Sequence, residues 1–341
     1  MTRVTPRNRG EKRADVYCTT LHIGITYDLR DDYLRAGYSA AQTAEFDGVE
    51  TIDGIDDALR KLGHTTDRVG NVRALVARLA EGERWDLVFN IAEGLTGFGR
   101  ESQVPALLEA YSIPYTFSDP LVLAIALHKG MAKRLVRDLG IPTPDFQVVE
   151  CGDPLDTIPL PLPCFAKPVA GGTSMGISTA CKITKQSQFG PVCAELRQRF
   201  AQPVLLEAFL PGREFTVGVL GTNKRARVLG VMEVVLLENA EPEIYSYRNK
   251  QRYRDCVRYR LADPDIAAAA ETMALAVWRG LGCRDAGRVD LRCDSNGQLQ
   301  FLELNPLAGL HPVDSDLVIL SRLIGMKYEE LIRQIVESAT R

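Results

Sequence analysis

Apolar and amphipathic stretches alternate through the first third of the chain. Residues 21–25 and 86–91 are apolar runs of strand length. Between them, apolar side chains recur at helical spacing over 52–62, and Asn71 precedes a second such run over 72–79, where it is a typical N-cap. This order of strand, helix, helix and strand predicts an open α/β domain, whose ligands gather at the carboxyl ends of its strands.

The pattern changes in the middle of the chain. Apolar spacing predicts one long helix over 120–139, ended by a Gly-Ile-Pro-Thr-Pro segment. Residues 164–169 and 177–183 are rich in apolar and β-branched side chains and predict two strands that flank the glycine-rich segment 170–176. A polar helix and a strand over 204–209 complete a small α+β unit.

The last third combines further strands, a polar stretch over 238–255, a helix over 263–281, a hairpin and C-terminal helices. We predict an α/β (α+β) chain of three modules. They cover residues 1–118, of which 1–20 are a flexible, solvated tail, 119–209 and 210–341.

Composition narrows the class of protein. The net charge of −3 gives no basic excess, so a dedicated nucleic-acid binder is not expected. The longest apolar run, 121–127, is far too short to span a membrane. The eight cysteines form no C-x-x-C pair, which argues against a zinc site and favours reduced thiols. Because residues 1–20 lack the apolar core of a signal peptide, we expect a cytoplasmic protein.

The hairpin in the last third carries the sharpest chemical prediction. Asn296-Gly297 predicts a two-residue turn, which pairs Asp290 with Glu303 and Arg288 with Asn305 on one face. Two facing carboxylates repel each other unless a cation lies between them, and oxygen ligands favour Mg²⁺. The alternative is a solvated face on which Arg288 neutralises a carboxylate. The opposite face would carry Val289, Leu291, Leu302 and Leu304.

The glycine-rich segment has three interpretations. Residues 172–176 match the G-x-S-x-G elbow of serine hydrolases, with Ser174 as nucleophile and Asp290 and His311 downstream. That elbow precedes a helix, however, and here a strand is expected. A loop between two strands, with Lys167 on the first, favours a flap over phosphates. A bare structural turn is the third interpretation.

These segments, together with several others, match one known family in order and spacing. The chain resembles the D-alanine–D-alanine ligase branch of the ATP-grasp superfamily over most of its length. The matching segments are Val88-Phe89-Asn90 with Glu93-Gly94, residues 140–144, Phe165-Ala166-Lys167-Pro168, residues 172–178, residues 211–217, Gly282-Cys283-Arg284, Gly287-Arg288-Val289-Asp290, and Leu302-Glu303-Leu304-Asn305 with Gly309.

The resemblance implies an ATP-grasp fold in which ATP lies between the second and third modules. It implies that ATP is bound by Lys129, Lys167, Glu207, Phe209, Leu210, Glu214 and Lys250. It assigns Asp290, Glu303 and Asn305 to two Mg²⁺ ions, with Mn²⁺ as an alternative ion. Taken singly, these lysines and acids are equally typical of a solvated surface.

The same resemblance implies an ATP-dependent ligation. A carboxylate attacks the γ-phosphate, and an amine then attacks the resulting acylphosphate. Arg288 and the Gly309 N–H would stabilise the oxyanion under a flap that carries Thr173 and Ser174, and Ser315 would bind the carboxylate of the acceptor. The implied partners are small amino-acid or carboxylate substrates and a second copy in a homodimer, with neither nucleic acid nor membrane.

The chain departs from the family pattern around the amino-acid substrates. Glu45 is the one candidate for the family's amine-binding glutamate, Glu93 replaces a histidine, and Gln251 replaces a tyrosine. We therefore expect a ligase whose substrates are not two D-alanines, with an acceptor that still carries a free carboxylate. A true D-alanine–D-alanine ligase, a hydrolase using Ser174 and a non-catalytic nucleotide-binding regulator remain alternatives.

Overall fold

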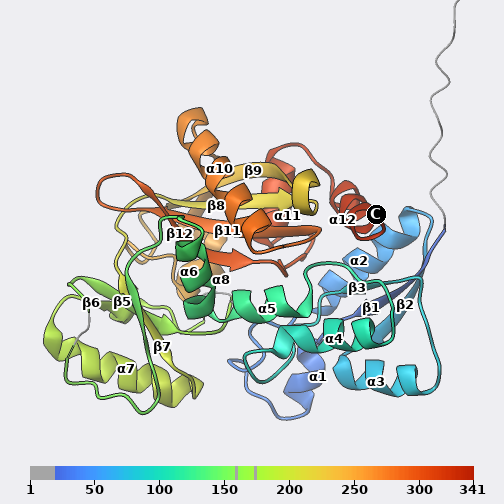
Figure 1. The fold of residues 1–341 in the computed structure, drawn as a ribbon, viewed down its shortest axis with the longest axis horizontal. Coiled ribbons are helices and arrows are strands. Elements are labelled where there is room, and N and C mark those ends of the chain that lie inside the picture. Colours follow the sequence, from blue (N-terminus) through green and yellow to red (C-terminus); the bar gives the residue numbers. More distant parts are fainter. Residues whose placement is uncertain (1–19, 158–159, 173–174) are drawn as a thin grey trace, which may run out of the picture.

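The computed structural model describes residues 20–157, 160–172 and 175–341, which form three sheets and the helices around them (Figure 1). The predicted tail lies almost entirely outside the described residues, and so do Thr173 and Ser174. The α/β prediction is confirmed: the first sheet is parallel, and the other two are antiparallel.

The parallel sheet has the order β2-β1-β3 and uses the residues of the predicted α/β domain. Its strands are β1 (His22–Thr26), β2 (Thr65–Gly70) and β3 (Leu87–Asn90). Helices α2 (Val49–Lys61) and α3 (Val72–Ala80) connect them, as the apolar periodicity predicted. The N-cap prediction is confirmed, because the Asn71 side chain accepts the backbone N–H groups of Arg73 and Ala74 at 3.0 and 3.2 Å.

The long helix predicted over 120–139 is wrong, because the chain breaks it into α5 (Pro120–Leu127) and α6 (Lys129–Asp138). His128 leaves helical geometry and bridges Ala170, and its Nδ1 accepts the N–H of Met131 at 3.2 Å. The Lys129 N–H donates to the Val169 carbonyl at 2.9 Å. Pairing with the segment after β5 therefore starts a new helix, whose first residue is Lys129.

The second sheet has the order β4-β7-β5-β6, with β4 (Phe146–Val149), β5 (Cys164–Pro168), β6 (Lys182–Ile183) and β7 (Val204–Ala208). Helix α7 (Gln186–Phe200) packs on one face of this sheet. The strand predicted over 177–183 shrinks to β6 alone. A 3-10 turn over Thr179–Cys181 takes its place, closed by the Cys181 N–H donating to Ser178 at 3.0 Å.

The third sheet has the order β10-β9-β8-β11-β12. Its strands are β8 (Glu214–Leu220), β9 (Arg227–Leu236), β10 (Val257–Leu261), β11 (Ala286–Cys293) and β12 (Leu299–Asn305), and α10 (Pro264–Gly280) covers one face. The remaining elements are α1 (Arg30–Arg35), η1 (Arg100–Ser102), α4 (Gln103–Ala110), η2 (Thr179–Cys181), η3 (Asn223–Arg225), α8 (Tyr247–Gln251), α9 (Tyr253–Cys256), α11 (Asp316–Leu323) and α12 (Tyr328–Ala339).

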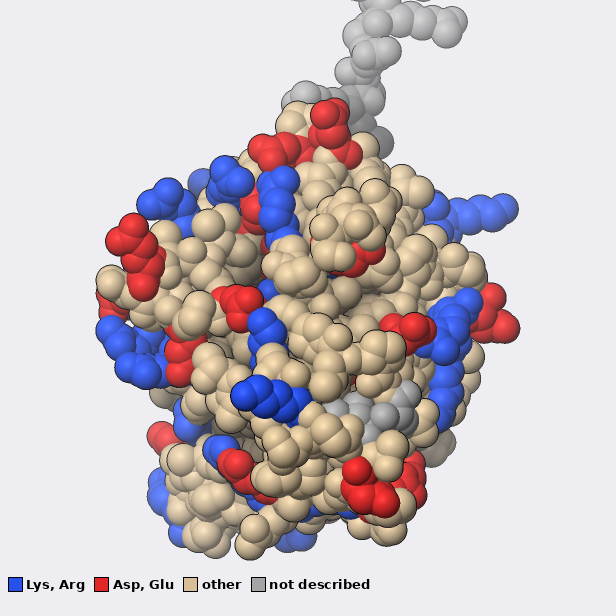
Figure 2. Space-filling model, turned by 90° about the vertical axis from the view of Figure 1, so that its left-hand side faces the viewer, with Lys and Arg blue, Asp and Glu red and all other residues tan. Residues whose placement is uncertain are grey.

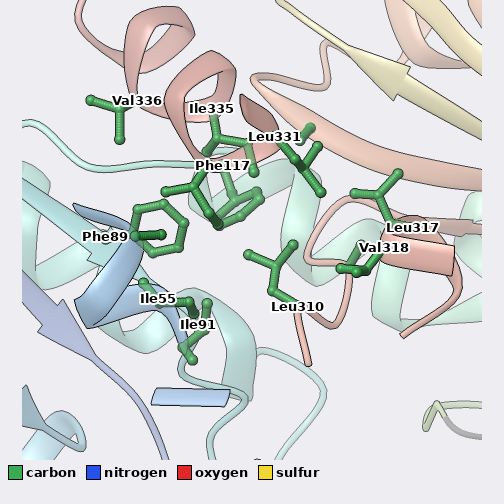
Figure 3. Close-up of a cluster of buried hydrophobic side chains, with 14 of the residues drawn as sticks. Ile55, Phe89, Ile91, Phe117, Leu310, Leu317, Val318, Leu331, Ile335 and Val336 are labelled. Atoms are coloured by element: carbon green, nitrogen blue, oxygen red, sulfur yellow. The ribbon is translucent and has the colours of Figure 1, made fainter. Parts of the chain in front are cut away.

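One apolar cluster joins the first sheet to the end of the chain. Phe89 from β3 packs edge to face on Phe117, with ring centroids 5.8 Å apart, and the cluster continues to Leu317 of α11 and Ile335 of α12 (Figure 3). Burial of this shared core holds the loops after β3 against the segment that follows β12. That junction is where the second of the two pockets described below forms.

The β11–β12 hairpin reaches the predicted pairing by a different route. Asp294 pairs with Gln298 around a three-residue loop in which Gly297 has φ +79°, so the predicted two-residue turn is wrong. The Asp294 carboxylate favours this loop by accepting the Asn296 and Gln298 N–H groups at 2.8 and 2.9 Å. A bulge at Leu302 then shifts the register back, and Asp290 pairs with Glu303 as predicted.

The bulge also changes the face on which Leu302 lies. Phe301 takes its place in the core under α10, and Leu302 turns toward the polar face. The apolar face predicted from strict alternation is therefore wrong at this one residue.

The surface matches the balanced composition. Lys and Arg are interspersed with Asp and Glu on the face that Figure 2 shows. The seven cysteines of the described residues are free, and six of them are buried. In the described part of the chain, none of the helices combines the length and the apolar character that crossing a membrane requires.

Candidate active site

A deep cleft separates the four-stranded sheet from the five-stranded sheet. Side chains of β5 and β7 line one wall, and side chains of β8, β11 and β12 line the other. The empty volume between these walls is about 970 Å³, including the solvent-filled mouth of the cleft. We call this space the inter-sheet cleft.

Strand alternation places the polar residues of β11 in the cleft. Arg288, Asp290 and Arg292 line it, while the residues between them lie in the core under α10. The neighbouring strand β8 supplies their partners. Thr216 donates to Asp290 at 2.9 Å, and Arg292 lies 3.1 Å from the Glu214 carboxylate. Burial raises the pKa of Glu214, and nearby Asp290 adds to this, while Arg292 opposes it.

Three ionised side chains are buried together at the floor of the cleft. The Glu207 carboxylate lies 2.6 Å from the Lys167 ammonium and 2.9 Å from that of Lys133. Burial alone would raise the pKa of Glu207, but the two lysines lower it to about 2. Burial lowers the pKa of Lys133 to about 8, although Glu207 opposes the shift. Glu207 thus holds Lys167 in the cleft through a buried ion pair.

Two further lysines approach the cleft from other elements. Lys129, at the start of α6, lies 3.6 Å from Glu303 and donates to the Gly171 carbonyl. Lys250, on α8, lies 3.2 Å from Asp316. Burial alone would raise the pKa of Glu303, but Lys129 and Lys167 outweigh it and lower it. The cleft therefore presents ammonium groups from three separate segments, which suits a polyphosphate.

The predicted hairpin patch is assembled as the sequence indicated. Asp290 and Glu303 are cross-strand partners, and the Asn305 amide donates to Asp290 at 3.1 Å. Burial raises the pKa of Asp290, and Glu303 and Asp316 contribute in the same direction. Arg288 contacts Asp290, so the neutralised-carboxylate alternative describes part of the arrangement.

This donor set fits Mg²⁺. Two carboxylates and an amide oxygen are hard ligands, and the raised pKa of Asp290 marks a place where added positive charge is favourable. Across residues 20–157, 160–172 and 175–341, no group of three His, Cys, Asp or Glu side chains has a metal-binding arrangement.

One end of the cleft is apolar. Phe209 stacks at a tilt on Phe165, with ring centroids 6.4 Å apart, and Leu210, Ile244 and Leu302 complete this lining. The bulge in β12 turns Leu302 into this space. A flat, apolar heterocycle fits between such side chains.

A second pocket opens from the cleft and shares several of its walls. Both spaces are bordered by Lys129, Lys250, Arg288, Glu303 and Asp316. Much of the rest of the second pocket comes from loops, namely residues 44–48, Glu93, residues 306–309 and residues 314–315, and the helices α2, α5, α8 and α11 and the turn η1 add further side chains. We call it the loop pocket. The predicted substrate residues Glu45, Glu93, Gln251 and Ser315 line it, as does Gly309.

Three carboxylates meet a buried arginine at one end of the loop pocket. The Arg100 guanidinium lies 2.8 Å from Glu45, 3.3 Å from Glu93 and 3.6 Å from Glu101. Burial and the neighbouring Glu101 raise the pKa of Glu93 well above its usual range. Burial raises the pKa of Glu101 to about 7, although Arg100 opposes the shift.

Gly94 allows this arrangement. It has φ +69°, and a Cβ atom there would lie 2.5 Å from the Arg100 carbonyl oxygen. Any other residue would push the Arg100 segment away. Glu45 also accepts the N–H of Gly172, which links the loop pocket to the start of the glycine-rich segment.

The described residues give no support to the serine-hydrolase interpretation. Ser174 lies outside them, and a 3-10 turn and a short strand follow the glycine-rich segment. His311 uses Nδ1 to accept the N–H groups of Val313 and Asp314 at 3.2 and 3.1 Å. That histidine therefore shapes the loop before α11.

The sequence analysis did not identify several residues of the two pockets. Lys133 follows Lys129 by four residues on one helix, a spacing that could have revealed their common face. Arg292 continues the alternation of Arg288 and Asp290 along β11. Arg100 and Asp316 had no local signal, because only the packing of distant loops brings them to the pocket.

Comparison with known families agrees with this architecture. Residues 135–337 match the family model described as the D-ala D-ala ligase C-terminus. A D-alanine–D-alanine ligase of Bordetella avium is 33% identical over 301 residues, covering 84% of this chain and 88% of that protein. An uncharacterised protein of Sinorhizobium fredii is 32% identical over 301 residues, covering 85% of this chain and 87% of that protein.

A solved structure shows the same fold. The D-alanine–D-alanine ligase of Bacillus anthracis complexed with ATP superposes with a TM-score of 0.72 at 20% sequence identity. The match covers 94% of this chain and 98% of that one.

Proposed function

The chain belongs to the D-alanine–D-alanine ligase family of ATP-dependent, carbon–nitrogen bond-forming ligases with the ATP-grasp fold, and from this premise we propose how its two pockets divide the reaction. ATP binds in the inter-sheet cleft, and the carboxylate and amine substrates meet in the loop pocket. The observation that carries the proposal is their common wall of Lys129, Lys250, Arg288 and Glu303. A phosphoryl group held there reaches both spaces.

Each part of ATP has a matching part of the cleft. The apolar end with Phe209 and Leu210 takes the base, and Glu214 takes the ribose hydroxyls. Lys129, Lys167 and Lys250 bind the phosphates, and burial of the Glu207 carboxylate between two lysines keeps Lys167 in place. We carry over Thr173 and Ser174 as flap residues from the family resemblance alone.

Asp290, Glu303 and Asn305 would hold Mg²⁺, in the two-ion arrangement that the family suggests and with Mn²⁺ as a substitute. Bound there, the metal would neutralise phosphate charge during phosphoryl transfer. The chain's own contribution is to place two carboxylates opposite each other on paired strands, with Asp290 buried and Glu303 partly exposed to the pocket.

The reaction runs in two steps. A substrate carboxylate oxygen attacks the γ-phosphorus, and ADP leaves with the electron pair of the broken P–O bond. An amine then attacks the carbonyl carbon of the acylphosphate, and phosphate leaves. Arg288 and the Gly309 N–H stabilise the oxyanion between these events. Exclusion of water from the loop pocket protects the acylphosphate.

The substrates set this protein apart from a D-alanine–D-alanine ligase. Glu45 was the candidate to bind the amine of the first substrate, but it already forms an ion pair with Arg100. Glu93 faces the same arginine. An unpaired polar group costs about 1–3 kcal/mol, so two mismatches would lower D-alanine turnover about 30-fold to 10⁴-fold.

A screen of ADP release tests the proposal. Purified protein is given ATP, Mg²⁺ and D- or L-amino acids, singly and in pairs, and products are identified by mass. Amide products that require ATP are expected. ATP binding without ADP release or amide product under any of these conditions would overturn the ligase function and favour a non-catalytic nucleotide-binding regulator.

Synthesis of D-alanyl-D-alanine is the second candidate, because the named relatives at 32–33% identity are D-alanine–D-alanine ligases. A kcat/KM for D-alanine above about 10⁴ M⁻¹s⁻¹ would establish it. The family resemblance also supports our proposals of a cytoplasmic homodimer and of module boundaries near residues 118 and 209. Light scattering and limited proteolysis test the dimer and the boundaries.

A further inference from the structure

A buried ammonium group lies behind the floor of the inter-sheet cleft. Lys133 on α6 is fully buried and is not among the described residues that line the cleft, whereas Lys167 and Glu207 are. Its Nζ donates to the Thr143 hydroxyl at 3.0 Å and to the Phe301 carbonyl at 3.3 Å. It also lies 2.9 Å from Oε2 of Glu207. These three oxygen atoms match the three N–H groups of an ammonium.

This ammonium connects the two sheets that form the cleft. Glu207 belongs to β7 of the four-stranded sheet, and Phe301 belongs to β12 of the five-stranded sheet. The chain between α6 and β4 strengthens the link. The Phe301 N–H donates to the Pro142 carbonyl at 2.7 Å, and the Thr143 hydroxyl donates to the Phe301 carbonyl at 3.0 Å. Lys133 therefore lies where both walls of the cleft meet.

The surroundings keep this buried side chain charged at neutral pH. Burial lowers the pKa of Lys133 to about 8, although Glu207 opposes the shift, so the ammonium is still protonated at pH 7. Its Nζ lies 5.9 and 5.8 Å from the ring centroids of Phe146 and Phe301, whose faces favour a cation. An apolar side chain would avoid the cost of burying a charge, which points to a role beyond packing.

The charge of Lys133 decides how much positive charge the floor of the cleft presents. Lys167 lies 2.6 Å from Oε1 of Glu207, and Lys133 lies beside the other oxygen. Two ammonium groups and one carboxylate give the floor a net charge of +1. Lys167 and Glu207 alone would form a neutral pair, which attracts phosphate weakly. Because these groups are buried, salt screens the difference only in part.

We propose that Lys133 is a positioning residue that supplies this net positive charge and thereby sets the affinity of the cleft for polyphosphate. It does not touch the nucleotide. It acts through Glu207, whose second oxygen it holds, and so allows Lys167 to turn toward a phosphate. This inference rests on the proposed nucleotide site in the cleft. The contribution of Lys133 should then grow with the charge of the ligand, from adenosine to ADP to ATP.

Nucleotide binding to Lys133→Met tests the inference, because methionine fills similar space without a charge. Isothermal titration calorimetry of the full chain with Mg²⁺ at pH 7 measures the Kd for ATP, ADP and adenosine. The Kd for ATP should rise at least about tenfold, that for ADP less, and that for adenosine less than about twofold. Arg134→Met removes an exposed cation from the next position of α6 and should change each Kd by less than about twofold.

A double variant distinguishes lost charge from damaged packing. Lys133→Met combined with Glu207→Gln returns the floor to one positive charge, that of Lys167. The ratio of the Kd values for adenosine and ATP should therefore return to within about threefold of the wild-type ratio. Packing damage alone would not be repaired by a second substitution at a buried site. Melting temperatures show whether each variant folds, and Lys133→Gln replaces Lys133→Met in both tests if the latter does not.

The outcomes separate this inference from the proposed function. An equal rise in the Kd for ATP and for adenosine, or no rise, would overturn the role of Lys133 and leave the nucleotide site standing. A double variant that binds ATP as weakly as the single variant would overturn that role as well. Failure of the wild-type protein to bind ATP would overturn the proposed nucleotide site itself.

Discussion

The inter-sheet cleft and the loop pocket share a wall, but they are built in different ways. In the cleft, the charged residues stand mainly on strands, and Glu207 and Asp290 face lysine or arginine partners across short, buried distances. The charged residues that the loop pocket does not share with the cleft stand on loops or on the turn η1, and carboxylates outnumber cations among the described lining residues.

This difference separates chemistry from specificity. Strand pairing fixes the spacing of Arg288, Asp290 and Glu303, so a common phosphoryl-transfer apparatus can persist. Loops accept substitutions without disturbing the sheets, so we expect substrate preference to be set mainly in the loop pocket. The two regions should therefore respond differently to substitution and to pH.

The largest effect is expected in the cleft. Glu303→Gln removes one of two facing carboxylates from the proposed Mg²⁺ site and should lower ATP turnover about 10³-fold, equivalent to about 4 kcal/mol of barrier. Steady-state ADP release measures this, and circular dichroism shows that the fold persists. The exposed Glu271→Gln on α10 is the control. Turnover near that of wild type would remove the metal assignment.

A stability effect is expected at the floor of the cleft. Glu207→Gln leaves Lys133 and Lys167 buried without their counter-ion, and breaking such a cluster costs about 3–5 kcal/mol. Urea unfolding measures the loss. Glu195→Gln, on the exposed face of α7, should change the free energy of unfolding by less than about 0.5 kcal/mol. A similar small change for Glu207→Gln would show that the cluster contributes little.

The pH dependence of stability should have opposite signs in the two regions. The folded pKa of Glu207, about 2, lies below its usual value of 4.5, so its contribution is present above pH 4.5 and fades as pH falls toward 2. The folded pKa of Glu101, about 7, is raised, so its contribution is present below pH 4.5 and is lost as pH rises to 7.

Glu101→Gln isolates the second of these contributions. Between pH 5 and pH 8, the variant should gain about 2 kcal/mol of stability relative to wild type, because it no longer has a buried acid to ionise. Urea unfolding across that pH range measures the difference. A constant difference between the two proteins would mean that Arg100 keeps Glu101 ionised throughout.

The smallest effect is expected away from both pockets. Asn71→Ala removes the side-chain cap of α3 and should cost about 1 kcal/mol of stability without changing kcat/KM. Thermal unfolding and ADP release measure the two quantities. A loss of activity in this variant would show that the first sheet influences the loop pocket more than its packing indicates.

Much of the fold and half of the site follow from local sequence. Periodicity predicts the strands and helices of the first sheet, and the cap at Asn71 is present as expected. The hairpin pairing of Asp290 with Glu303 was predicted correctly, although a three-residue loop and a bulge at Leu302 produce it together. Each of these features depends on neighbours a few residues apart along the chain or across one turn.

The sequence alone therefore determined the ligase family, the acidic residues on the paired strands and the lysines that are candidates for binding ATP. Only the tertiary structure decided which charges meet. Lys133 reaches Glu207, Arg100 reaches Glu45, and Arg288 lies beside Asp316 because separate elements pack together. A buried charge takes its partner from whatever the fold brings within a few ångströms, and sequence separation does not limit that choice.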